Sequence, residues 1–235
     1  MSWTLTPLEW EALSLSLKVA TWATAASLPL GVLVAWVLAR RRFPGHGILN
    51  GVVHLPLVLP PVVVGYVLLI VLGRGGALGG WLYETFGLSL AFTWKGAAVA
   101  AAVMAFPLMV RAMRLSLEAV DPGLEQAART LGATPLRVFF TVTLPLMLPG
   151  VITGSVLAFA RALGEFGATI TFVSNIPGET RTLPLALYNF TQVPGGENSA
   201  LRLAVLAVIV ALIALIASEA LARRVRRMTQ GEVHD

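Results

Sequence analysis

Long apolar stretches, each about as long as a lipid bilayer is thick, dominate the pattern of hydrophobic and polar positions along the chain. A membrane-spanning helix needs about 20 consecutive, mostly apolar residues. Five stretches meet this requirement and predict five transmembrane helices, at about 13–39, 48–73, 90–113, 142–164 and 202–222. Because only helices satisfy their own backbone groups within one segment in lipid, we expect an all-α membrane protein in which residues 1–235 form a single transmembrane domain.

Prolines interrupt two of these stretches. Pro56, Pro60 and Pro61 lie within the second stretch, and Pro145 and Pro149 lie near the start of the fourth. Each proline removes a backbone donor and disturbs the helical turn before it. Two interpretations stay open. The prolines either adjust the packing of helices, or they break helices that line a translocation path, which would place Pro60 and Pro61 on that path.

The composition indicates lipid as the main solvent. The chain is 57% hydrophobic and 12% charged, with a mean hydropathy of +0.80, whereas a soluble domain carries about 25% charged residues. The net charge of +5 raises the alternative of nucleic-acid binding, but the basic residues lie at the ends of apolar stretches. We therefore expect a lipid membrane and no nucleic acid as partner. The absence of cysteine excludes disulfides, thiolate metal sites and cysteine nucleophiles.

The basic residues also predict how the chain is oriented. An excess of Lys and Arg marks the cytoplasmic face of a membrane protein. We therefore expect a multi-pass protein of the cytoplasmic (inner) membrane, with its N-terminus extracytoplasmic and its C-terminus cytoplasmic, as an odd number of spans requires. Eleven of the 17 basic residues fall on one side of the predicted helices: Arg40, Arg41, Arg42, Arg111, Arg114, Arg129, Arg137, Arg223, Arg224, Arg226 and Arg227.

The polar stretch between the third and fourth predicted spans, at about 121–137, predicts a short helix, a turn and a second helix. Asp121 followed by Pro122 is typical of an N-cap and a first helical position. Gly132 supplies a left-handed end, and Thr134 followed by Pro135 repeats the helix opening.

One apolar stripe follows from helical spacing within this loop, at Leu124, Ala127, Ala128 and Leu131. Two of its four members are alanine, so another protein can approach the helix backbone closely. The alternative is a helical hairpin that packs on its own membrane domain.

The segment from Gln126-Ala127-Ala128 through Gly132 to Val142-Thr143-Leu144-Pro145 resembles the Glu-Ala-Ala loop of binding-protein-dependent ABC importer permeases. That loop has the form Glu-Ala-Ala, three residues, Gly, nine residues, Ile, any residue, Leu-Pro, and the spacing matches throughout. Gln126 stands at the acidic position beside Glu125, and Val142 replaces the isoleucine. The resemblance implies that the loop inserts into a cleft of a cytoplasmic ATPase subunit and transmits its motion. The implied coupling residues are Glu125, Gln126, Ala127, Ala128, Gly132, Leu144 and Pro145.

Three further segments are similar to the molybdate permease branch of that family: His54–Gly65, Gly164–Ala168 and Ser174–Thr182. The resemblance implies ATP-driven import of molybdate, or also of tungstate, by alternating access. It also implies two copies of this chain, two ABC ATPase subunits and an extracytoplasmic molybdate-binding protein. Sulfate/thiosulfate permeases share the loop and the Gly-Glu-Phe-Gly segment, so they are the alternative. The short five-span layout favours molybdate.

We expect no catalytic residue, metal or cofactor in this chain. Neither of its lysines, Lys18 and Lys95, follows a glycine in a phosphate-binding loop, so the partner subunit must hydrolyse the ATP. An intramembrane hydrolase would need a serine beside a base, or a His-Glu metal spacing, and neither pattern occurs. A self-sufficient channel would leave the cytoplasmic loop without a role.

An oxyanion path needs hydrogen-bond donors, because a dianion is poorly solvated in hydrocarbon. The candidate donors are Thr153, Ser155, Thr169 and Thr171. The alternative for all four is a hydrogen bond to a carbonyl of their own helix.

Arg161 and Glu165 are four residues apart near the end of the fourth span, which places them side by side on a helix. Charges in a membrane segment are usually paired or directed toward water. We expect a structural ion pair that shapes the outer gate, and direct contact of Arg161 with the anion is the alternative. Gly150 and Gly154 belong to a small-residue face suited to close helix contact, which could also be a dimer or pathway surface. Residues 167–201 are expected to form a partly re-entrant outer region that faces the binding protein.

Overall fold

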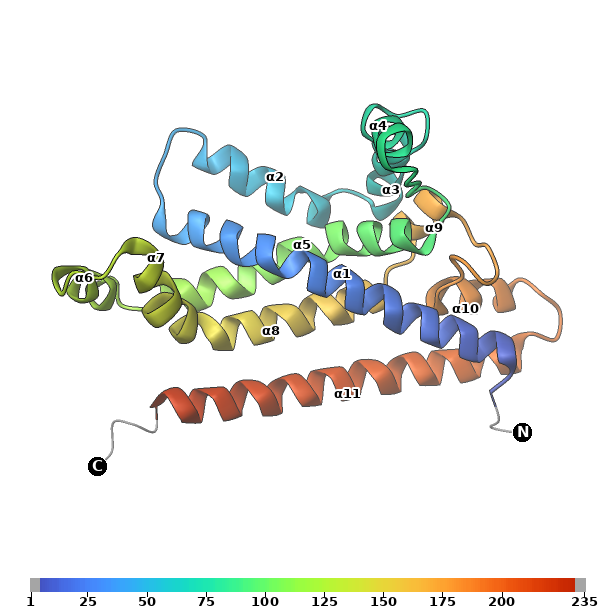
Figure 1. Cartoon of the computed structure of the whole chain (residues 1–235). Helices are drawn as coiled ribbons and strands as arrows, with labels where there is room; N and C mark the ends of the chain where they lie inside the picture. The colour runs from blue at the N-terminus through green and yellow to red at the C-terminus, as the bar shows by residue number, and fades with distance from the viewer. Residues whose placement is uncertain (1–4, 231–235) are drawn as a thin grey trace.

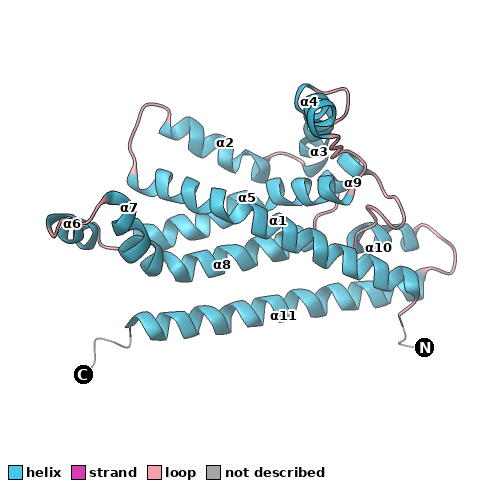
Figure 2. Cartoon of the chain, in the orientation of Figure 1, coloured by secondary structure: helices cyan, strands magenta, loops and turns pink. Residues whose placement is uncertain are grey.

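The computed structural model describes the backbone of residues 5–230, with side chains described up to residue 217 and at residue 220. Within residues 5–230 every regular element is a helix, which confirms the predicted all-α class (Figure 2). Four helical segments are long and apolar enough to cross a membrane, or five if one bent pair counts as a single span. They are α1 (Pro7–Arg40), α5 (Trp94–Glu118), the continuous run of α7 (Pro135–Val138), η1 (Phe139–Thr143) and α8 (Leu144–Leu163), and α11 (Glu197–Gln230).

The long helices lie side by side in an elongated bundle, with α5 packed against both α1 and α8 (Figure 1). Several of them begin or end beyond the predicted limits. Helix α1 begins at Pro7 because Thr6 and Glu9 form a capping box. The buried carboxylate of Glu9 also lies 2.7 Å from a guanidinium nitrogen of Arg202, which ties the start of α1 to α11.

The predicted second span is broken at Pro60 and Pro61, as the prolines in this stretch allowed. The chain bends by 115° between helix α2 (His46–Val58) and helix α3 (Pro61–Leu72). Leu59 and Pro60 each precede a proline, and both have extended backbone angles, with ψ of 142° and 132°. The residue before a proline is disfavoured in the helical region, so two successive prolines force the break at this point. Pro56, in contrast, is accommodated within α2.

Shorter helices lie at the two ends of this bundle (Figure 1). Helix α6 (Pro122–Thr130) lies at one end, beside α7. At the opposite end are α4 (Ala77–Phe86), which the hydrophobic pattern did not predict, and α9 (Gly167–Val173) and α10 (Leu183–Thr191), which lie within the predicted re-entrant region. Helix α9 packs against α3 and α5.

The small-residue face of α8 packs inside the chain. A Cβ atom added at Gly150 would overlap the Cβ of Ser116, and one at Gly154 would lie 2.9 Å from the carbonyl oxygen of Met109. Both contacts are to α5. The prediction of close helix contact is therefore confirmed, and the alternative of a dimer or pathway surface is wrong for these two glycines.

Most of the arginines that we assign to the cytoplasmic face lie at the α6 end of the bundle. Seven of the eleven arginines assigned to the cytoplasmic face belong to the end of α1, the later part of α5, α6, α7 and the adjoining loop. The other four, Arg223, Arg224, Arg226 and Arg227, lie outside the residues whose side chains the structure describes. Which end faces the cytoplasm stays a prediction.

Candidate functional site

Helix α6 is defined at both ends by local hydrogen bonds. The side chain of Asp121 accepts a bond of 2.8 Å from the backbone N–H two residues on. At the other end Gly132 has φ of +85°, and it donates to the carbonyl of Arg129 at 2.9 Å, while the next residue donates to that of Ala128 at 3.1 Å. These two bonds form a Schellman motif, which a glycine in the left-handed region permits. The predicted helix and its glycine end are confirmed.

One face of α6 is open to solvent. Leu124 is 50% exposed and Leu131 is 89% exposed, and Ala127 between them is exposed as well. Apart from Ala128, which is half-buried, the stripe does not pack on the membrane domain of its own chain. Its role as a docking face stays a prediction. Gln126, at the acidic position of the loop pattern, is exposed too.

Glu125 lies on the opposite side of α6 and is 8% exposed. Its Oε1 atom lies 3.1 Å from Nε of Arg40 and accepts a bond of 3.0 Å from the hydroxyl of Thr143. A second nitrogen of Arg40 donates to the carbonyl of Val120 at 3.1 Å. We call Glu125, Arg40 and Thr143 the Glu125 brace. Because it joins α6 to α1 and η1, Glu125 is held inside the chain, and Gln126 is the one of the two that faces outward.

The turn before α8 is a π-helix that sequence reasoning missed. The backbone N–H of Leu144 donates to the carbonyl of Phe139, five residues earlier. Pro145 at the start of α8 has no N–H to continue the regular ladder, which gives a physical reason for the wider turn. Thr143, the last residue of η1, is buried and reaches Glu125. Leu144 and Pro145 therefore act here on backbone geometry, and their predicted role in coupling stays a prediction.

Arg161 and Glu165 form the expected ion pair at the other end of α8. The distance from Nη1 of Arg161 to Oε2 of Glu165 is 2.7 Å. Glu165 is 2% exposed, and its other oxygen accepts a bond of 2.8 Å from the backbone N–H of Ala168 in α9. One carboxylate therefore holds both an arginine and the first turn of α9. Its role at a gate stays a prediction.

The four candidate hydroxyls do not form one set of open donors. Ser155 donates to the carbonyl of Val151 at 2.7 Å, and Thr171 donates to that of Gly167 at 2.9 Å. For these two the alternative of bonding their own helix holds. Thr169 is 1% exposed, and Thr153 is half-buried on α8.

The structure brings part of the predicted path together where α3 meets α9. A Cβ at Gly65 would lie 2.5 Å from the carbonyl oxygen of Ala168 and 2.9 Å from the Cβ of Thr171. A Cβ at Gly167 would lie 2.7 Å from the Cβ of Pro61. Pro61 and Thr171 therefore belong to one contact, and Pro60 lies beside it at the break between α2 and α3.

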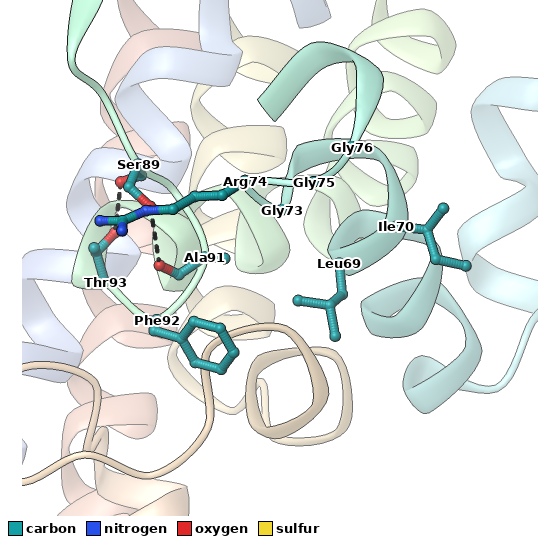
Figure 3. Close-up of a pocket in the computed structure, with 10 residues that line it drawn as sticks. All are labelled: Leu69, Ile70, Gly73, Arg74, Gly75, Gly76, Ser89, Ala91, Phe92 and Thr93. Atoms are coloured by element: carbon teal, nitrogen blue, oxygen red, sulfur yellow. Dashed lines mark hydrogen bonds between the residues drawn. The ribbon is translucent and has the colours of Figure 1, made fainter. Parts of the chain in front are cut away.

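A cavity of about 760 Å³ near this end was not predicted (Figure 3). Arg74 points across it and donates from Nε to the hydroxyl of Ser89 at 3.3 Å. The guanidinium group of Arg74 also lies 4.6 Å from the ring centre of Tyr83. The predicted path residues are not among those that line this cavity. Among the described residues no group of three or more His, Asp or Glu side chains is placed to hold a metal ion.

Comparisons with known proteins give this geometry its context. The family model described as "Binding-protein-dependent transport system inner membrane component" matches residues 27–227. The molybdenum transport system permease protein ModB of Escherichia coli K12 is 64% identical over 219 residues, which cover 93% of this chain and 96% of that protein. ModB of Haemophilus influenzae is 59% identical over 229 residues, which cover 97% and 100%. A probable sulfate transport permease, cysT of Chlorokybus atmophyticus, is 40% identical over 173 residues, 74% of this chain and 60% of that one.

Two solved structures show the same fold. An inward-facing methionine transporter, MetNI, aligns with a TM-score of 0.69 at 21% identity over 96% of this chain and 99% of that chain. A bacterial alginate ABC transporter aligns with a TM-score of 0.72 at 16% identity over 94% and 80%. With the family match over most of its length, this chain belongs to the inner membrane components of binding-protein-dependent transport systems.

Proposed function

We propose that this chain is the transmembrane subunit of an ATP-driven importer that moves molybdate across the cytoplasmic membrane by alternating access. We infer the substrate from the 64% identity, over nearly the full length of both chains, to a permease named for molybdenum transport. The relative named for sulfate transport is 40% identical over 74% of this chain. Molybdate is therefore favoured over sulfate or thiosulfate. Tungstate is expected to be carried as well, because its tetrahedral dianion is nearly equal in size.

The second part of the proposal is the assembly. Two copies of this chain, two cytoplasmic ABC ATPase subunits and an extracytoplasmic molybdate-binding protein form the working importer, and ATP is bound by the ATPase subunits. The support is the family match together with the exposed apolar face of α6. A short helix with Leu131 89% exposed suits insertion into a cleft of another protein.

The third part is how motion reaches the far end of the bundle. The Glu125 brace connects α6 to the end of α1 and to η1, which continues directly into α8. At the other end of α8, Glu165 holds the start of α9, and α9 packs on α3 through Gly65. A displacement of α6 by the ATPase would therefore move α8 and, through it, the contact where we place the outer gate, with Pro60, Pro61, Arg161 and Glu165 on the path.

The proposed orientation places the α6 end in the cytoplasm. The natural absence of cysteine allows a direct test with single cysteines. Leu131→Cys lies on α6, and Val193→Cys, at a residue that is 50% exposed, lies in the loop between α10 and α11 at the opposite end. In intact cells a membrane-impermeant thiol reagent should label Val193→Cys and spare Leu131→Cys. The reverse pattern would overturn the orientation.

The function is tested by reconstituting this chain with its ATPase in proteoliposomes. ATP hydrolysis and anion uptake are measured with binding protein loaded with molybdate, tungstate or sulfate. Molybdate and tungstate should stimulate both activities, and sulfate should leave them at the basal rate. Stimulation by sulfate alone would replace the proposed substrate with the alternative.

A further inference from the structure

An apolar groove runs between α1 and the α7–η1–α8 segment. It has a volume of about 510 Å³, and most of its surface is apolar. Trp36 on α1 meets Phe139 on η1 edge to face, with 6.2 Å between ring centres, and both residues line the groove. Leu33, Leu136 and Phe140 line it and are 55%, 69% and 56% exposed. The groove therefore offers exposed apolar surface at the end of the bundle near α6.

A second, polar cavity of about 240 Å³ adjoins the groove at α6. The two cavities share Trp36, Arg41, Glu125 and Arg129 in their linings. Among the charged side chains that line them, Glu125 is the only acidic one, and it is already paired with Arg40 in the brace. Arg41 and Arg129 are both exposed, which leaves two positive charges where the apolar groove becomes polar. Arg41 is further positioned by Trp36, whose ring centre lies 5.1 Å from its guanidinium carbon.

We propose that this groove binds one anionic phospholipid from the adjacent leaflet, with an acyl chain in the apolar part and the phosphate between Arg41 and Arg129. The apolar and cationic parts follow one another as the chain and headgroup of a lipid do. Basic residues at a membrane surface attract anionic headgroups, and arginine pairs well with phosphate. A zwitterionic lipid would place its positive group near these arginines as well and would bind less strongly.

A bound lipid would have a consequence for coupling, because Arg41 directly follows α1 as its C-cap and Arg129 belongs to α6. The phosphate would hold these two elements together beside the Glu125 brace. The proposal depends on the membrane location of the chain and not on molybdate as substrate. It therefore stands or falls separately from the proposed function.

Native mass spectrometry of the complex of this chain with its ATPase tests the proposal. After delipidation in detergent, phosphatidylglycerol or phosphatidylcholine is added back in steps. About one phosphatidylglycerol should bind tightly per copy of the chain. Arg41→Gln should weaken that binding about fivefold, the effect of one basic residue near an anionic surface. The matched control is Arg42→Gln, which removes the same charge. Arg42 lines the cavity beside His46, as Arg41 does, but it lines neither the groove nor the polar cavity at α6.

A second pair of variants tests the apolar part of the site. Leu33→Trp should fill the groove and reduce phosphatidylglycerol binding, whereas Leu30→Trp should not, although Leu30 is equally exposed at 55% on the same helix. Equal binding of phosphatidylcholine, equal effects of Arg41→Gln and Arg42→Gln, or equal effects of the two tryptophan variants would overturn the proposal. So would a complex that binds no lipid at this site because a neighbouring protein subunit covers the groove.

Discussion

The two ends of the bundle each contain a buried carboxylate with two partners, but the partners differ. At the α6 end, Glu125 binds Arg40 of α1 and Thr143 of η1, which are far from it in the sequence. At the other end, Glu165 binds Arg161 and the backbone of Ala168, both within four residues. The first carboxylate joins separate elements, and the second shapes a single turn between α8 and α9. Loss of the first should therefore disturb the arrangement of the subunit more than loss of the second.

Glu125→Ala is expected to have the largest effect. The substitution leaves the guanidinium of Arg40 without a carboxylate partner, although the Arg40 side chain is only 14% exposed. It also removes the oxygen that accepts the hydrogen bond from the Thr143 hydroxyl. Breaking one partner of a buried pair costs about 3 kcal/mol or more. This loss of about 3 kcal/mol of stabilising free energy would release α6 from α1. We therefore expect molybdate uptake in proteoliposomes to fall at least about tenfold.

The matched control is Glu118→Ala. Glu118 pairs with Arg114 at 2.7 Å, but its side chain is 41% exposed. Exposed pairs four residues apart contribute about 0.3–0.5 kcal/mol, so uptake should stay near the wild-type rate. Equal uptake by Glu125→Ala and the wild type would show that transport does not depend on the brace that holds α6.

Arg161→Gln, which removes the cation paired with Glu165, should destabilise the subunit less than Glu125→Ala does. Glu165 keeps its bond from Ala168 but loses its cation, and Arg161 is 29% exposed, so we expect a cost of about 2 kcal/mol. The measurement is the thermal midpoint and yield of the assembled complex, which should fall while transport per assembled complex is largely kept.

A double variant separates two roles of Arg161. In Arg161→Gln with Glu165→Gln no buried charge is left, and the amide oxygen can still accept from Ala168, so assembly should recover. Normal assembly of the single variant with loss of transport would indicate that Arg161 contacts the anion directly.

The helices at the α6 end were predictable because their signals are local. Asp121, Pro122 and Gly132 define the ends of α6 within a dozen residues. The spacing identified an apolar stripe on α6 but left open whether this stripe would face solvent or pack on its own domain. The brace was not predictable in the same way. Nothing in the sequence indicates that Arg40 meets a residue 85 positions later, and the π-helix depends on how Pro145 is accommodated in three dimensions.

At the far end of the bundle, too, the local features were predictable and the long-range packing was not. The ion pair of Arg161 and Glu165 follows from helical spacing and was predicted, as was a break near Pro60. The angle of that break and the packing of α3 on α9 depend on contacts between residues about a hundred positions apart. Helix α4 was missed because its apolar residues lie among glycines next to a longer apolar stretch.

Gly65→Ala tests this long-range packing. The added methyl group would meet backbone atoms of Ala168, so α3 and α9 must separate, and overpacking of this kind costs about 1–3 kcal/mol. The thermal midpoint of the purified protein should fall. Gly51→Ala is the control, because that glycine lies within α2 with no heavy atom within 4 Å of the added Cβ. It should raise the midpoint slightly, because alanine is more favourable than glycine inside a helix by about 0.5–1 kcal/mol. Similar midpoints for the two variants would contradict the close approach of α3 and α9.

Removal of single hydroxyls should have the smallest effect and distinguishes a path lined by side chains from one shaped by backbone breaks. Ser155→Ala and Thr171→Val remove donors that already bond the carbonyls of Val151 and Gly167, so neither has a free proton to offer an anion. The KM for molybdate uptake should change less than about twofold, because a hydroxyl that bonds its own helix makes no contact with the anion. Thr153→Val provides the comparison on the same helix as Ser155. A several-fold rise in KM for Ser155→Ala alone would mean that its hydroxyl leaves the helix carbonyl during transport, and the path would then have to be placed along α8 rather than at the break between α2 and α3.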